Sequence, residues 1–312
     1  MSASRLASRL LTLVLGGVLV TGLAGCAAGT LPPVGTPAPP EPSVAPGVLL
    51  GRTAEAMRTT TGPVDVTVAM SGKVAVSGGT EPVSLDGFTV SMSFQAQPLT
   101  LLMKMHIPAT GAGAMDMEIR IVDGVMYLSM PGSLPGWYSM SLDELKGMSE
   151  ASGGAMAGGG PLPSIDPSVV EDLLSGDGLR VEYGNPEQLD GRPMRVVRIT
   201  VTKDWLERLL TTAMDASGGA TSLPMSMDEL TAALPDEVPM SLWIDAATSL
   251  PRRFTVSIAS QGDQHIDMTV DLRAHDGPLQ VAAPPAGEVK SFTDMFGGSM
   301  PGIGLPLESP AP

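Results

Sequence analysis

The chain has little cysteine, few aromatic side chains and few basic ones. Its 312 residues include a single cysteine, Cys26, so no disulfide can form within the chain and packing must hold the fold together. Lys and Arg total 18 against 33 Asp and Glu, which gives a net charge of −15. A chain this acidic repels polyanions and has no basic stripe, which argues against nucleic-acid binding.

The sequence also lacks the residue patterns of an enzyme. His106, His265 and His275 stand in separate segments with no HExxH motif and no cysteine partner, so we expect no zinc site. No Gly-x-Ser-x-Gly nucleophile elbow is present. Asp245 and Arg252-Arg253 flank a predicted turn and are expected to set its register. Five acidic residues alternate with apolar ones and are expected on a solvated outer face: Asp65, Asp116, Glu118, Asp267 and Asp271. We therefore expect neither catalysis nor a cofactor.

The N-terminal segment has the pattern of an export signal. Arg5 and Arg9 precede an apolar run over 10–20, which is too short to cross a membrane as a helix. Basic residues, an apolar run and small residues in this order predict a secretory signal peptide over 1–25. The residues Leu-Ala-Gly directly before Cys26 closely resemble the bacterial lipobox. The resemblance implies cleavage before Cys26, acylation of that residue and anchoring to the outer face of the cell membrane.

The mature chain divides into three parts by composition. Residues 26–47 are rich in proline and nearly uncharged, which predicts an extended tether. Residues 48–281 form the predicted domain, and 282–312 are rich in Pro and Gly, which predicts a partly disordered tail. Within the domain, 146–163 are rich in glycine and small residues and are expected to form a mobile loop, with a role as a lid left open.

Hydrophobic periodicity predicts helices and an antiparallel sheet. Residues 48–60 and 203–214 carry apolar residues at helical spacing. From Val64 apolar and polar residues alternate, as in half-buried strands, and Asp123-Gly124 is a hairpin signal between two of them. Short connections between strands predict antiparallel pairing. The order of elements predicts an α+β fold whose helices cover one face of the sheet.

Several short segments then resemble one family. They are Val122-Asp123-Gly124-Val125-Met126-Tyr127-Leu128, Gly136-Trp137-Tyr138, Leu242-Trp243-Ile244-Asp245 and Thr248-Ser249-Leu250-Pro251-Arg252-Arg253. With the lipobox, these segments resemble the actinobacterial LppX/LprG lipoproteins, which are similar in fold to the LolA/LolB lipoprotein carriers. The resemblance covers about 48–275. It implies a strongly curved antiparallel half-barrel packed around a few helices, with an apolar cavity that binds acylated lipids for transport through the envelope.

The expected cavity would be lined from one face of the sheet and one helix. Methionine is abundant, at 21 residues, and its flexible side chain adapts to irregular apolar shapes. The candidate lining residues are Phe88, Val90, Met92, Phe94, Leu101, Met103, Met105, Met115, Met117, Ile119, Trp205 and Leu209. The expected partners are a glycolipid or phospholipid, the membrane through Cys26 and, as a further candidate, a membrane transporter. Two alternatives stay open: a core of Ala, Val and Met without a ligand, and an interaction or sensor module whose helices fill the sheet.

Overall fold

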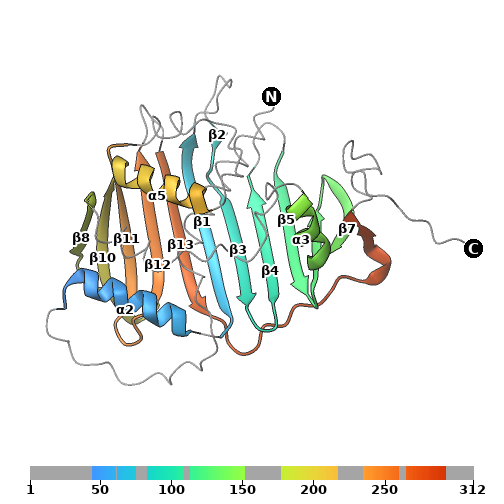
Figure 1. Cartoon of the computed structure of the whole chain (residues 1–312), viewed down its shortest axis with the longest axis horizontal. Coiled ribbons are helices and arrows are strands. Elements are labelled where there is room, and N and C mark those ends of the chain that lie inside the picture. Colours follow the sequence, from blue (N-terminus) through green and yellow to red (C-terminus); the bar gives the residue numbers. More distant parts are fainter. Residues whose placement is uncertain are drawn as a thin grey trace, which may run out of the picture.

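One large sheet organises the molecule (Figure 1). The computed structural model describes residues 44–60, 62–74, 83–108, 113–151, 177–216, 235–259 and 265–292. The sheet has 14 strands, of which twelve run side by side in the order β14-β7-β6-β5-β4-β3-β1-β13-β12-β11-β10-β8. Two short strands lie off this path, β2 beside β1 and β9 beside β10.

The first seven strands are β1 (Val64–Val74), β2 (Val83–Ser84), β3 (Phe88–Gln95), β4 (Thr100–Ile107), β5 (Met115–Val122), β6 (Val125–Met130) and β7 (Leu134–Ser141). The predicted alternation is confirmed in β1, β3, β4 and β5, whereas no strand was predicted at β2 or β7. Asp123 and Gly124 join β5 to β6 with φ values of 53° and 76°. Positive φ at both residues is the geometry of a tight hairpin turn, so the predicted Asp-Gly hairpin is confirmed.

The second half of the chain completes the sheet by pairing with the first strand. Its strands are β8 (Leu179–Tyr183), β9 (Glu187–Leu189), β10 (Arg192–Thr202), β11 (Glu237–Asp245), β12 (Pro251–Ala259), β13 (His265–Ala274) and β14 (Val289–Ser291). Strand β13 pairs antiparallel with β1 from Val64 opposite Ala274 to Lys73 opposite His265. This long pairing joins the early and late strands into one continuous surface.

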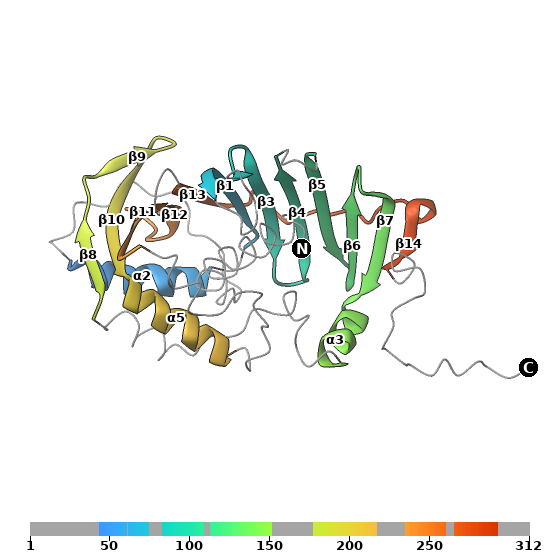
Figure 2. The ribbon, with the colours of Figure 1, turned by 90° about the horizontal axis from the view of Figure 1, so that it is seen from above.

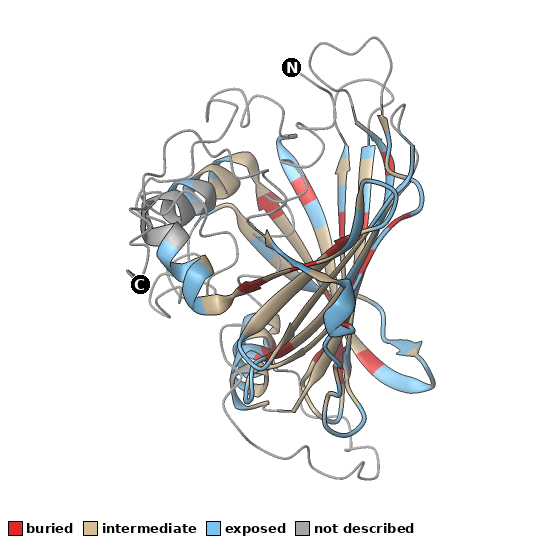
Figure 3. Ribbon diagram, turned by 90° about the vertical axis from the view of Figure 1, so that its right-hand side faces the viewer, coloured by how far each residue is buried: buried red, intermediate tan, exposed pale blue. Residues whose placement is uncertain are grey.

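Three described α-helices lie on one side of the sheet (Figure 2). They are α2 (Pro46–Thr59), α3 (Leu142–Ala151) and α5 (Lys203–Ala216), with a short 3-10 helix η1 at Ala286–Glu288. None of the described helices is long and apolar enough to cross a lipid bilayer. The sheet is curved and does not close on itself (Figure 3), so the predicted α+β class with a curved antiparallel sheet is confirmed.

Helix α3 begins at a capping box. The backbone N–H of Ser141 donates to the Glu144 carboxylate at 2.8 Å, and the Glu144 N–H donates to the Ser141 hydroxyl at 3.1 Å. The helix then continues to Ala151, so the loop predicted over 146–163 is wrong for its first six residues. Good helix formers in this stretch offset Gly147. Residues 152–163 lie outside the described part of the chain.

The C-terminal strand corrects two predictions. Strand β14 pairs in parallel with β7, with Lys290 opposite Tyr138, although short connections predicted only antiparallel pairs. The sheet also continues past residue 281, where the predicted domain ends. The connecting segment is held by distant residues: Leu279 N–H donates to Gln95, and Arg120 donates to the Ala282 carbonyl at 2.9 Å. Contacts between residues so far apart in the chain produce no local pattern of apolar residues, so the sequence did not predict them. Residues 293–312 lie outside the described part.

The core lies between the central strands and the helices. Its buried side chains come mainly from β1, β3 and β13, and Trp205 and Leu206 of α5 pack against them. A second cluster forms where Leu49 of α2, 1% exposed, packs against Val197 and Ile244. Both clusters use the apolar face that alternation along each strand creates.

Candidate functional site

The sheet brings the predicted cavity residues of β3, β4 and β5 together on one face. Val90 lies opposite Met105, which lies opposite Met117. A parallel row runs through Met92, Met103 and Ile119, and a third through Phe94 and Leu101. Directly opposed side chains have Cβ atoms about 5 Å apart. These residues therefore form a continuous apolar surface, which we call the methionine face.

Burial changes across this surface. Phe88 and Val90 are 2% and 4% exposed and belong to the closed core, packed beside β1 and β13. The other candidate residues of β3 and β4 and those in the middle of β5 are half-buried: Met92, Phe94, Leu101, Met103, Met105, Met117 and Ile119. Met115, at the start of β5, is 37% exposed. The apolar face thus extends beyond the closed core towards β5.

The helices contact the sheet mainly near its ends. The strongest helix–strand contacts are α2 with β8, α5 with β10 and α3 with β7. Trp205 is half-buried and packs against the core cluster, as a core residue would, and its role as a cavity wall stays a prediction. Leu209 belongs to α5, and its side chain lies outside the described part of the structure. Cys26 and the signal segment also lie outside the described residues.

The opposite face of the sheet is polar and carries the acidic residues expected there. Arg253 donates twice to Asp271, at 2.7 and 3.1 Å. Asp116 pairs with Nδ1 of His106 at 2.7 Å, and Asp65 accepts from Ser93. Within the described ranges no group of three or more His, Cys, Asp or Glu side chains is placed to hold a metal ion. These contacts are ion pairs and hydrogen bonds across neighbouring strands.

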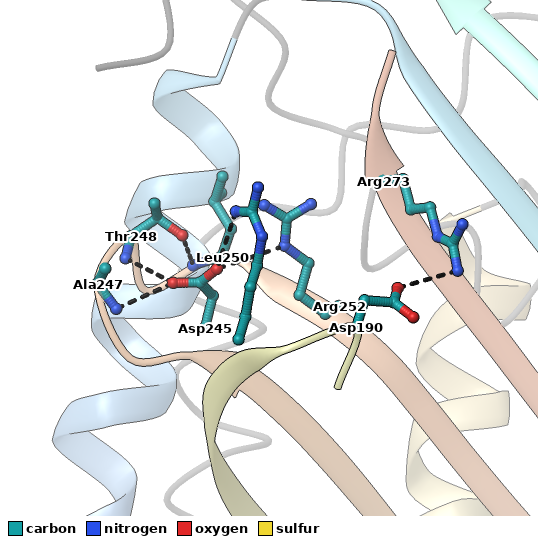
Figure 4. Close-up of polar contacts among 8 residues, drawn as sticks. Asp190, Asp245, Ala247, Thr248, Leu250, Arg252 and Arg273 are labelled. Atoms are coloured by element: carbon teal, nitrogen blue, oxygen red, sulfur yellow. Dashed lines mark hydrogen bonds and ion pairs between the residues drawn. The ribbon is translucent and has the colours of Figure 1, made fainter. Parts of the chain in front are cut away.

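Asp245 anchors the turn between β11 and β12. Its side chain is buried, and Oδ1 accepts the backbone N–H groups of Ala247 and Thr248 at 2.9 and 3.1 Å (Figure 4). Its second oxygen faces Nη1 of Arg192 at 3.4 Å and Nε of Arg252 at 3.7 Å. The expectation that Asp245 and Arg252-Arg253 set the register of this turn is confirmed for Asp245. Arg253 instead pairs with Asp271 on β13, and Arg192 of β10 also approaches Asp245.

A pocket of about 320 Å³ opens beside this turn. It lies between the β9–β10 hairpin and the ends of β12 and β13, where Arg273 pairs with Asp190 of the hairpin tip at 3.0 Å (Figure 4). The lining residues are Leu189, Asp190, Arg192, Met194, Arg252, Asp271, Leu272, Arg273, Ala274 and Asp276. We call it the arginine pocket. The sequence signal for it was weak, because its three arginines stand on three separate strands.

Comparison with known proteins gives structural likenesses at low identity. No family model matches the chain, and no curated protein matches it. Lipoprotein LppX of Mycobacterium tuberculosis is 16% identical, with 76% of this chain and 97% of that chain covered and a TM-score of 0.42. LprF of Mycobacterium bovis is 15% identical, covering 76% and 96%, with a TM-score of 0.41. A putative outer membrane lipoprotein-sorting protein domain of Vibrio parahaemolyticus is 11% identical, covering 75% and 92%, with a TM-score of 0.22.

In structure, the chain is thus similar to LppX and LprF at low sequence identity. All three TM-scores lie below 0.5, so the description of the fold rests on the strand order and pairing given above.

Proposed function

We propose that this protein is an exported lipoprotein that binds acylated lipids on the methionine face and carries them within the cell envelope. The observation that best supports this proposal is the change in side-chain burial between β3 and β5. Val90 is 4% exposed, while Met105 and Met117 in the same cross-strand row are half-buried. An acyl chain would complete the burial of this row, with about 0.8 kcal/mol gained for each methylene removed from water.

The chemistry of the face suits acyl chains of varied shape. Met103, Met105 and Met117 lie next to one another in the sheet, and unbranched thioether side chains repack around different chains at small cost. On β4 and β5 the charged residues Lys104, Asp116 and Glu118 lie on the opposite face, so a chain bound on the methionine face would not contact them. The lipid would be a glycolipid or a phospholipid, with its headgroup at the open end of the face.

The sequence supplies the proposed location. The lipobox implies that Cys26 holds the protein at the outer face of the cell membrane, and 26–47 would act as a tether. A lipid taken from that membrane would then be delivered onward, with a membrane transporter as a candidate partner. The protein would act without catalysis or a cofactor.

Native mass spectrometry with solvent extraction tests the proposal. The full chain, expressed in an actinobacterial host and purified in detergent, should carry a co-purifying lipid at defined stoichiometry beyond the acyl groups on Cys26. A chain that stays free of lipid after incubation with envelope lipids would overturn the carrier function. It would leave the interaction or sensor module as the better description.

Substitutions that fill the methionine face with a larger side chain test whether the lipid binds there. Met103→Trp and Met117→Trp fill the half-buried part of the face and should abolish loading while leaving the fold intact. Lys104→Trp is the matched control, because Lys104 neighbours Met103 on β4 but is exposed on the polar face. Equal loading in all three variants would exclude the methionine face as the lipid site.

A further inference from the structure

Strand β8 forms one edge of the sheet, at the left of Figure 1. Its only neighbour among the described strands of the main strand order is β10. Just beyond the end of β8, the backbone N–H of Gly184 donates to the carbonyl of Val196. Hydrogen-bonded and non-bonded pairs alternate along an antiparallel ladder, so Leu179, Val181 and Tyr183 direct their N–H and C=O groups away from β10. The backbone of β8 thus offers a row of donors and acceptors at the edge of the sheet.

The two edges of the sheet differ in how they are protected against pairing with another strand. The usual protections of an edge are short length, lysine, proline and bulges. At the far edge, β14 has three residues and carries Lys290. Strand β8 has five residues, contains neither lysine nor proline, and pairs with β10 without a shift in register. The β8 edge is therefore suited to accept a further strand.

The sequence of β8, Leu-Arg-Val-Glu-Tyr, is complementary to itself in an antiparallel pairing. A two-fold axis at Val181 places Arg180 opposite Glu182 of a second copy and Leu179 opposite Tyr183 of that copy. The outward N–H and C=O groups of Leu179, Val181 and Tyr183 would then bond across the axis. Arg180 and Glu182 would occupy the closely spaced positions of this ladder, where opposite charges stabilise a strand pair.

The side chains that such a partner would cover are exposed in the single chain. The side chains of Arg180 and Glu182 are 59% and 63% exposed. Their contact within one chain is 3.7 Å, longer than the about 2.7–2.9 Å of a well-formed charged hydrogen bond. Tyr183 is 44% exposed, and Val48, in the first turn of α2, is 53% exposed. Because α2 contacts β8, exposed apolar surface lies along this edge as well as charge.

We propose that two copies of this chain associate through β8, antiparallel and centred on Val181, so that one sheet continues across a two-fold axis. The charge pattern favours a second copy over another partner, because Arg180 and Glu182 match each other only when the same strand is inverted. The paired edge is short, so the dimer would be a weak one. The association does not involve the methionine face and goes beyond the proposed carrier function.

The N-terminal end of the described chain lies beside this edge. The hydroxyl of Tyr183 donates to the carbonyl of Val44, so the segment that leads back to Cys26 leaves the domain next to β8. In the dimer both tethers would begin near the axis and on the same face of the sheet. Residues 26–43 would span about 50 Å as a proline-rich extended chain, at about 3.1 Å per residue. Anchoring of both copies through Cys26, which rests on the proposed function, would raise their local concentration.

Sedimentation equilibrium of the full chain in density-matched detergent tests the dimer. At physiological ionic strength the net charge of −15 on each copy is screened beyond about 8 Å. The parent chain should show a monomer–dimer equilibrium that depends on its concentration. Arg180→Glu and Glu182→Arg should each weaken the dimer at least about tenfold, because each places like charges opposite one another on both sides of the axis. Both side chains are exposed, so we expect folding to change little.

An equimolar mixture of the two variants separates lost pairing from lost folding. In a mixed dimer the two acidic residues of one chain face the two basic residues of the other, so association should return to within about threefold of the parent value. Asp143→Arg is the matched control. It changes the charge as Glu182→Arg does, but Asp143 is exposed on α3, which contacts β7 near the opposite edge of the sheet. Its dimerisation should stay within about twofold of the parent.

Three results would overturn the proposal. A parent chain that stays monomeric up to high micromolar concentration would leave the β8 edge to an extended segment of another protein. Either variant alone dimerising as tightly as the parent, or a mixture that stays monomeric, would exclude the Val181-centred pairing. A loss in Asp143→Arg equal to that in Glu182→Arg would assign the effect to net charge and not to β8. Dimerisation of the parent and of the mixture, with weak association of each variant alone, would uphold it.

Discussion

Val90 of β3 lies directly opposite Met105 of β4, yet Val90 is 4% exposed while Met105 is half-buried. The closed core therefore ends between two neighbouring strands whose apolar residues are in register. Beyond that line the same face continues onto β5 without the same degree of burial. This boundary separates fully buried residues from the half-buried ones of the methionine face, to which the proposed function assigns the lipid.

Truncating a side chain of the closed core should lower the free energy of unfolding more than truncating one on the half-buried part of the methionine face. Phe88→Ala removes a side chain that is 2% exposed and should lower the free energy of unfolding by about 3–5 kcal/mol. Met105→Ala should cost less than about 2 kcal/mol, because part of its surface already meets solvent. Urea unfolding followed by circular dichroism measures both. Equal losses would mean that Met105 is a core residue and that the boundary is misplaced.

Gly72 allows β1 to pass close to β13. It has a φ of +117°, and a Cβ there would lie 2.0 Å from the carbonyl oxygen of His265. Gly72→Ala should therefore lower the free energy of unfolding by at least about 3 kcal/mol, from backbone strain and the forced shift of a strand. Gly124→Ala is the control, because φ is +76° there but no atom lies within 4 Å. It should cost about 1–2 kcal/mol. A smaller loss at Gly72 than at Gly124 would contradict the close approach.

Asp245 has two roles: it accepts hydrogen bonds from the turn, and its buried charge faces Arg252. Two substitutions separate these roles. Asp245→Asn keeps the oxygen that accepts the N–H groups of Ala247 and Thr248 but removes the charge beside Arg252. It should cost about 1–3 kcal/mol. Asp245→Ala loses both roles and should cost about 3–5 kcal/mol. Chemical denaturation midpoints measure the difference, and equal costs would show that the buried charge alone matters.

Glu144 should give helix α3 a pH dependence. Hydrogen bonds from the Ser141 backbone N–H and then from its hydroxyl lower the pKa of Glu144 below its ordinary value of 4.5. The folded state therefore favours the ionised carboxylate. Its contribution is present above the unfolded pKa and disappears as the pH falls through the lower folded pKa. Glu144→Gln should melt below the parent chain at pH 7, with the gap closing at acid pH.

Thermal melts at several pH values check this, with Asp143→Asn as the control in the same helical turn. Asp143 lies in the first turn of α3 beside the capping residue Glu144. A gap for Glu144→Gln that persists unchanged below pH 4 would show that the ionised cap contributes nothing. A gap of equal size in Asp143→Asn would assign the effect to the charge of the first turn in general.

Several elements could be predicted because their causes are local. Alternation along 88–94 and 101–107 depends on one strand at a time, and the structure places strands there as Phe88–Gln95 and Thr100–Ile107. The Asp123-Gly124 hairpin and the Ser141–Glu144 capping box each depend on a few adjacent residues. The candidate residues of β3, β4 and β5 share a face because the side-chain period of a strand is two.

The sequence by itself determined the strands with clear alternation, such as β3, β4 and β5, the apolar face of each of them, and the segment that resembles a lipobox. Only the tertiary structure decided that β13 pairs with β1, that β14 joins β7 in parallel, and where along the methionine face the closed core ends. It also decided that Arg192, Arg252 and Arg273 meet around one pocket. Each of these features joins residues far apart in the chain. Their energies come from packing and charge between separate elements, which no local pattern of residues records.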